Sequence, residues 1–108
     1  MGVYYKVVCD KRRESISPGR VNAGGIKAGE ITGEHCALGR LVMATMLERW
    51  YGAPCRLVAD ESEDPAYDEY DDVTGDVIAD YNQRFPHHEP IRHESYGQYL
   101  TRTKSETT

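Results

Sequence analysis

Apolar and polar residues alternate in blocks along the chain, and these blocks predict a few strands and two helices. Residues 3–9 and 55–59 are rich in β-branched, aromatic and aliphatic side chains, which is typical of strands within a sheet. Weaker patterns over residues 15–17 and 26–31 predict an edge strand and a further short strand. The polar stretch 10–25, with its Pro-Gly and Gly-Gly pairs, indicates a long loop around that edge strand.

Residues 35–51 form the clearest helical pattern. Apolar side chains recur at steps of three and four, at Leu38, Leu41, Val42, Met46 and Trp50. Gly52 and Pro54 follow as stop signals. The broad apolar stripe predicts a helix packed on the sheet, with a core made of Leu41, Val42, Met46, Trp50, Val7, Leu57 and Val58.

A second helix is expected from Thr74, a good N-cap residue, to about residue 84. Asp64 and Pro65 predict a single helical turn before it, since Asp caps helices and Pro is favoured at the first helical position. The sequence therefore predicts an α/β fold. It has a small three- to four-stranded sheet with two helices packed on it, in the order β-β-α-β-α.

The length of 108 residues fits one domain. We expect a single α/β domain over residues 1–100 and a disordered C-terminal tail over residues 101–108, which has no core-forming pattern. No window approaches 18 apolar residues, so a membrane span is not expected, and the N-terminal residues lack the apolar run of a signal peptide. The three cysteines form no Cys-x-x-Cys pair, which favours buried thiols and a reducing, cytoplasmic setting.

The acidic residues are concentrated in one part of the chain. Residues 60–80 hold ten Asp or Glu and no Lys or Arg, whereas residues 1–59 hold nine bases and five acids. Such a segment repels nucleic acid, so direct nucleic-acid binding is not expected. It favours a cationic partner or, as the simpler interpretation, serves as a solvated surface that keeps the protein soluble.

Two predicted strands end in a carboxylate, which raises the alternative of a metal site. Asp10 follows residues 3–9, and Asp60 and Glu61 follow residues 55–59. The helix between the strands is consistent with a parallel crossover, which would bring Asp10 and Asp60 to the same edge of the sheet. Carboxylate oxygens suit magnesium, so this arrangement would support a metal-assisted enzyme acting on phosphate esters. An ordinary turn role for both residues competes with it.

Other catalytic chemistry has weaker support. Cys36 stands at the start of the first predicted helix, but the adjacent His35 is poorly placed as its base. The spacing of Cys and His matches no structural zinc pattern, and the Gly24-Gly25 pair lacks the rest of a phosphate-binding loop. The sequence thus leans away from an enzyme and predicts no cofactor.

The leading interpretation is a small acidic, non-enzymatic interaction protein of the inhibitor or immunity type. It would present residues 60–80 to a basic protein partner, in one variant as a mimic of nucleic acid. Tyrosines interleave with the acids, and Tyr is enriched at interface cores. The predicted contact surface consists of Asp68, Glu69, Tyr70, Asp71 and Asp72. The pattern does not determine an oligomeric state.

Overall fold

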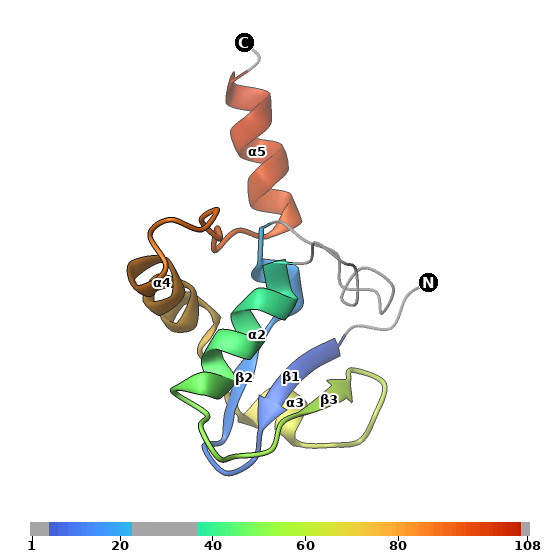
Figure 1. The fold of residues 1–108 in the computed structure, drawn as a ribbon. Helices are drawn as coiled ribbons and strands as arrows, with labels where there is room; N and C mark the ends of the chain where they lie inside the picture. Colours follow the sequence, from blue (N-terminus) through green and yellow to red (C-terminus); the bar gives the residue numbers. More distant parts are fainter. Residues whose placement is uncertain (1–4, 23–36, 107–108) are drawn as a thin grey trace.

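The computed structural model of the chain describes residues 5–22 and 37–106 (Figure 1). The strands are β1 (Tyr5–Cys9), β2 (Glu14–Ile16), β3 (Arg56–Ala59) and β4 (Asp71–Asp72). The helices are η1 (Pro18–Arg20), α2 (Ala37–Leu47), α3 (Ala66–Glu69), α4 (Thr74–Arg84) and α5 (Tyr96–Glu106). This small mixed sheet with helices on it confirms the predicted α/β class.

The sheet has the strand order β3-β1-β2-β4. β1 pairs with β2 and with β3 in antiparallel directions, and β2 pairs with β4 in parallel. A tight turn joins β1 to β2, in which Arg13 adopts a positive φ of 54° and its N–H donates to the Asp10 carbonyl.

The parallel crossover considered from the sequence is wrong, since the register places Tyr5 opposite Ala59 and Val8 opposite Arg56. The end of α2 explains the antiparallel direction. The Trp50 indole donates to the Glu14 carboxylate, and Glu14 pairs with Cys9 at the end of β1. The short connection from Trp50 therefore enters β3 beside the end of β1, and the new strand can only run back along it.

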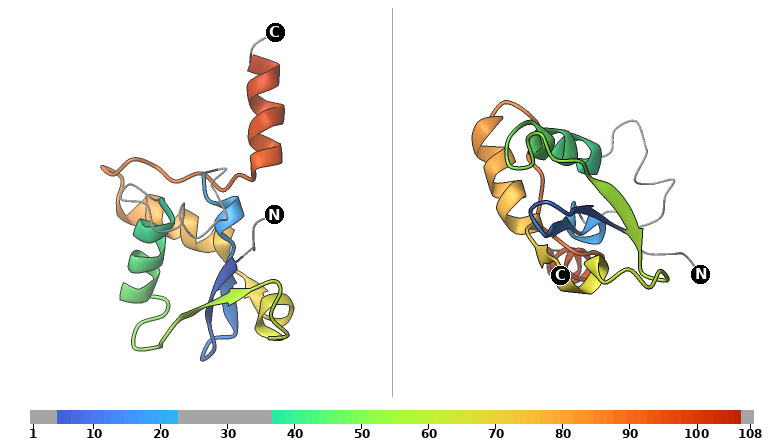
Figure 2. Two further views of the ribbon diagram at one scale, coloured as in Figure 1. Left: turned by 90° about the vertical axis from the view of Figure 1, so that its right-hand side faces the viewer. Right: turned by 90° about the horizontal axis from the view of Figure 1, so that it is seen from below.

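Two apolar clusters cover the two faces of the sheet, because side chains alternate along a strand. Val7 and Cys9 belong to the main core with Ile16, under α2 and α4. Val8 faces the other way and packs with Val58 and Ala66 of α3. Figure 2 shows the corresponding layers, with α2 and α4 on one side of the sheet and α3 near the other.

The expected core residues are confirmed in part. Leu41, Trp50, Val7 and Val58 are buried, and Val42 is half-buried against the core. The other two expectations are wrong, because 37% of Met46 and 53% of Leu57 are exposed. Leu57 pairs with Val7, which places it on the helix-covered face, but β3 is the last strand of the described sheet, so Leu57 has a neighbouring strand on one side only.

The predicted helix over residues 35–51 begins in the structure no later than Ala37 and ends earlier, at Leu47. The chain then turns, with the Trp50 N–H donating to the Thr45 carbonyl, and Gly52 has a φ of 77°. Residues 35 and 36 and the predicted strand over residues 26–31 lie outside the described residues. The prediction of a helix from Thr74 to about residue 84 is confirmed by α4.

The end of the chain differs from the expected disordered tail, because residues 101–106 belong to α5. The start of this helix explains the difference. Ser95 and Gln98 form a capping box: the Gln98 side chain accepts from the Ser95 N–H, and the Ser95 hydroxyl accepts from the Gln98 N–H. Arg102 also bonds to Glu94, just before the helix, with Nε 2.9 Å from Oε2.

Helix α5 extends away from the sheet and the other helices (Figures 1 and 2). Among the described helices, none combines the length and the apolar character needed to cross a bilayer.

Candidate functional site

The predicted contact surface occupies α3, which packs on β1 and β3, and β4, which pairs with β2 at one edge of the sheet. Asp68 and Glu69 end α3, Tyr70 follows it, and Asp71 and Asp72 form β4. Asp64 explains why this segment is ordered, since its Oδ1 accepts from the Ala66 N–H at 3.0 Å and caps the helical turn. β4 is then fixed by its parallel pairing with Glu14 and Ser15 of β2.

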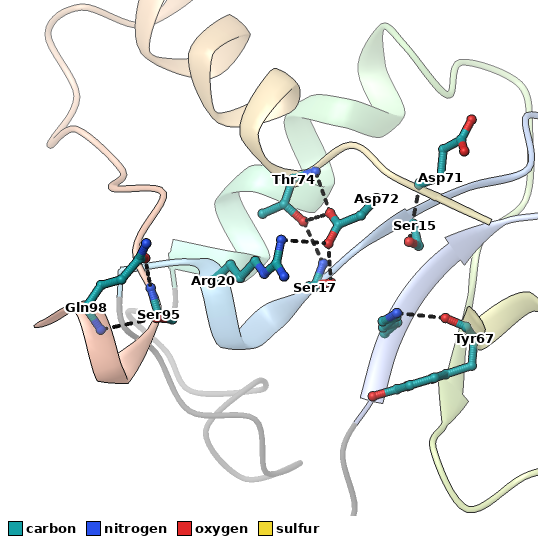
Figure 3. A network of polar contacts seen from close by, with 10 residues as sticks. Ser15, Ser17, Arg20, Tyr67, Asp71, Asp72, Thr74, Ser95 and Gln98 are labelled. Carbon is teal, nitrogen blue, oxygen red and sulfur yellow. Dashed lines mark hydrogen bonds and ion pairs between the residues drawn. The ribbon is translucent and has the colours of Figure 1, made fainter. Parts of the chain in front are cut away.

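Asp72 bonds to groups within the fold. Its Oδ2 accepts from the Ser17 hydroxyl at 2.8 Å and lies 3.5 Å from Arg20 Nη1. Its Oδ1 accepts from both the N–H and the hydroxyl of Thr74. Figure 3 shows Asp72 between these three side chains. The side chain is 29% exposed, and it links the start of α4 to the segment after β2.

The pKa of Asp72 reflects these contacts. Burial raises the pKa, but the hydrogen bonds from Thr74 and Ser17, helped by the charge of Arg20, outweigh burial and hold the pKa below its ordinary value. The ionised carboxylate therefore stabilises the fold, and its oxygens are already occupied by hydrogen bonds that a partner would have to replace.

Tyr70 is also engaged. Its hydroxyl donates to Asp10 Oδ1 at 2.6 Å, and the guanidinium of Arg13 lies 5.1 Å from its ring centroid. The bond to Asp10, together with burial, raises the pKa of the Tyr70 hydroxyl. The half-buried side chain thus connects the acidic segment to the turn after β1.

Three members of the predicted surface present their carboxylates to solvent. Asp68, Glu69 and Asp71 are exposed. Glu69 lies 4.0 Å from Arg13, and both side chains are so exposed that the pair contributes little. Figure 3 shows the Asp71 carboxylate turned away from the network around Asp72, as alternation along a strand requires. The predicted surface is thereby divided into three outward carboxylates and two residues engaged within the fold.

The carboxylates proposed as magnesium ligands do not come together. Asp10 lies beside Arg56 at the start of β3, whereas Asp60 and Glu61 follow Ala59, which pairs with Tyr5 at the other end. The metal prediction depended on parallel strands, and the antiparallel register removes its basis. Within residues 5–22 and 37–106, no three His, Cys, Asp or Glu side chains are grouped to hold a metal ion. Cys36 and His35 lie outside the described residues.

Asp10 instead binds a guanidinium. Arg56 donates from Nε to Oδ2 and from Nη2 to Oδ1, and its Nη1 lies 2.6 Å from Asp64 Oδ2. The bonds from Arg56 and then from Tyr70 lower the pKa of Asp10 from 3.8 to about 2. The hydrogen bond from Arg56 likewise lowers the pKa of Asp64, and the two carboxylates raise the pKa of Arg56. This cluster joins β1, β3 and the start of α3.

Sequence reasoning missed a second charged cluster, at Glu14. Arg49 Nη2 lies 2.7 Å from Glu14 Oε2, its Nε lies 3.0 Å from Oε1, and the Trp50 indole N–H lies 2.9 Å from Oε1. The bonds from Arg49 outweigh burial and lower the pKa of Glu14, which is 13% exposed. No sequence pattern connects these residues, because 35 positions separate Glu14 from Arg49.

A cavity of about 320 Å³ lies between α2 and α4. Three of its charged lining residues are paired: Arg84 Nη1 lies 2.8 Å from Glu48 Oε2, and Arg49 bonds to Glu14. The cavity is therefore a gap beside one ion pair, which links α4 to the residue after α2.

Comparisons of the chain with protein-family models, curated proteins and solved structures find no match.

Proposed function

We propose that this protein is an acidic interaction module that binds a basic protein partner through α3 and β4. The contact carboxylates are Asp68, Glu69 and Asp71. The observation that carries the proposal is their joint exposure on two consecutive elements, α3 and β4. Asp72 and the Tyr70 hydroxyl, which the sequence also predicted as contacts, are left out because they bond within the fold.

The charge of the segment supports a cationic partner. Residues 60–80 contain ten acids and no base. The two acids bound most closely within the fold are Asp64 and Asp72, and the outward carboxylates keep a negative field over α3 and β4. A field of this kind accelerates the encounter with a positively charged surface, and added salt weakens it.

The half-buried Tyr70 and Tyr67 add amphipathic surface next to the acids. Both rings carry a cation from the chain itself: Arg13 lies over Tyr70, and Lys6 Nζ is 4.3 Å from the Tyr67 centroid. A Lys or Arg of a partner would bind in the same way, with its cation over a tyrosine ring and close to a carboxylate.

The test compares two charge reversals of equal size. The variant Asp68→Lys/Asp71→Lys changes the proposed surface, while Glu61→Lys/Glu63→Lys changes two exposed acids in the loop before α3. Immobilised wild-type protein is used to capture a partner from the host lysate, and the purified partner is then titrated with each variant. We expect the first variant to lose at least about tenfold in affinity, or about 1.4 kcal/mol, and the second to lose much less.

Circular dichroism controls for folding of both variants. Asp72 is left intact in this design because its bonds to Thr74 and Ser17 stabilise the fold. An equal loss in both variants would show a general charge effect without a defined surface. Unchanged affinity in the first variant, or capture of partners that are not basic, contradicts the proposed function.

A further inference from the structure

Cys9 ends β1, and Cys55 immediately precedes the antiparallel neighbouring strand β3. The register ends with Val8 opposite Arg56, and continued by one residue it places Cys9 opposite Cys55. Opposite residues in such a pair have Cα atoms about 4.5–5.5 Å apart. That spacing falls within the range of about 4.4–6.8 Å found for disulfides.

The two thiols also lie on the same face of the sheet. Cys9 is a fully buried member of the main core, and Cys55 packs against that same cluster from the position just before β3. The Sγ of Cys55 lies 3.8 Å from the Sδ of Met46 on α2, which places it on the helix-covered side. Both cysteines are reduced in the structure.

The electrostatics of Cys55 agree with this proximity. Burial raises the pKa of the Cys55 thiol, and the second contribution, in the same direction, comes from Cys9. Two thiolates close together repel each other, so the nearby Cys9 disfavours ionisation of Cys55. Cys55 is half-buried while Cys9 is fully buried, and reagents in solvent therefore meet Cys55 first.

We propose that Cys9 and Cys55 form an oxidative modification site, at which a small-molecule disulfide such as oxidised glutathione converts the two thiols into one intramolecular disulfide. Cys55 loses its proton and attacks one sulfur of the small molecule. A mixed disulfide forms, and the first thiolate leaves. Cys9 then loses its proton and attacks Cys55 Sγ, the protein disulfide forms, and the second small thiolate leaves. The protein gives up two electrons and two protons, and one small disulfide becomes two thiols.

The disulfide would tie β1 to β3, the last strand on that side of the described sheet, and would close the chain segment that contains α2. A cross-link over so long a segment restricts the unfolded chain. The oxidised protein should therefore unfold at a higher denaturant concentration than the reduced protein. This inference is independent of the proposed partner surface, which consists of the outward carboxylates of α3 and β4.

The test oxidises the folded, full-length protein with oxidised glutathione and counts thiols. The sequence has three cysteines, and we expect one free thiol to remain. The intact mass should fall by two hydrogen atoms, without retained glutathione. Trypsin separates the cysteines into peptides 7–11, 28–40 and 50–56, and digestion without reduction should yield 7–11 linked to 50–56. The rate should increase with pH, since the thiolate is the attacking species.

Single-cysteine variants show which cysteine attacks the small disulfide and which closes the protein disulfide. In Cys55→Ala the mass loss should disappear, and in Cys9→Ala glutathione should remain attached to Cys55. Cys36→Ser should oxidise as the wild type does. If Cys9→Ala does not fold, the linked peptide of the wild type and the mass of oxidised Cys55→Ala still show whether Cys9 and Cys55 form the disulfide. The proposal is overturned by a link to Cys36, by glutathione that stays on Cys55 in the wild type, or by oxidation of Cys9 only in denaturant.

Discussion

Arg56 binds both carboxylate oxygens of Asp10, with Nε 2.8 Å from Oδ2 and Nη2 3.0 Å from Oδ1. This two-point contact joins the turn after β1 to the first residue of β3, and only antiparallel strands bring those two points together. The residue that the sequence offered as a magnesium ligand is thus held by a guanidinium. A divalent cation at Asp10 would have to displace that group.

The first prediction concerns the titration of Asp10. Its pKa is lowered from 3.8 to about 2 in the folded protein, so the contact stabilises the fold above pH 4 and this contribution is lost as the pH falls toward 2. In Arg56→Gln the pKa of Asp10 should rise toward 3.8. Carboxyl-carbon NMR of the folded protein measures both values. Lys11→Gln removes a charge from the same turn and should leave the pKa low; equal shifts in both variants would contradict the role of Arg56.

The second prediction concerns Glu14. Glu14→Gln keeps the shape of the side chain but removes the charge that Arg49 and Trp50 contact, and it should lower the free energy of unfolding by about 1–3 kcal/mol. Arg12→Gln is the matched control, because exposed Arg12 lies 4.0 Å from the same carboxylate. We expect that control to change stability by less than about 0.5 kcal/mol. Urea unfolding followed by Trp50 fluorescence provides the measurement, and equal effects would rule out a specific contribution from Arg49.

The third prediction uses two leucines of one helix. Leu41 is fully buried on the core side of α2, whereas Leu47, six positions later in the same helix, is 64% exposed. Leu41→Ala should cost about 2–5 kcal/mol, the usual range for a buried leucine truncation. Leu47→Ala should stay within about 0.5 kcal/mol, as for most surface changes. Denaturant unfolding of both variants compares them directly, and a loss below about 0.5 kcal/mol for Leu41→Ala would show that this face of α2 is not the core.

The fourth prediction concerns the end of the chain. Helix α5 extends away from the sheet (Figure 1), so deletion of residues 101–108 should shift the Tm by less than about 4 °C, which corresponds to a change below 1 kcal/mol. Ile91→Ala is the contrasting variant, because Ile91 is buried in the main core just before α5. It should lower the Tm by more than about 8 °C. Calorimetry that shows a comparable loss on deletion would mean that the end of the chain packs on the domain.

Local signals along the chain were enough to predict α4 and the single turn of α3. Asp64 and Pro65 marked the turn, and the pattern after Thr74 marked the helix, because caps and helical periodicity act between residues a few positions apart. The capping box of Ser95 and Gln98 is an equally local signal, but the weak apolar pattern after residue 100 favours disorder instead.

In the candidate surface, too, the sequence predicts the segment but not the role of each residue. The sequence alone identified residues 60–80 as the acidic part of the chain, but it treated Asp71 and Asp72 alike. Alternation along β4 turns Asp71 outward and Asp72 onto Thr74 and Ser17, and that choice depends on the pairing of β4 with β2.

The sequence by itself therefore determined the α/β class, the helices with strong periodicity and the position of the acidic segment, because composition and short-range pattern fix these properties. Only the tertiary structure decided the direction of β3, the separation of Asp10 from Asp60 and the partners of Glu14 and Asp72. The physical reason is that strand direction and ion pairing join residues far apart in the chain. These contacts form only where the folded chain brings the partners together, and no local pattern encodes that arrangement.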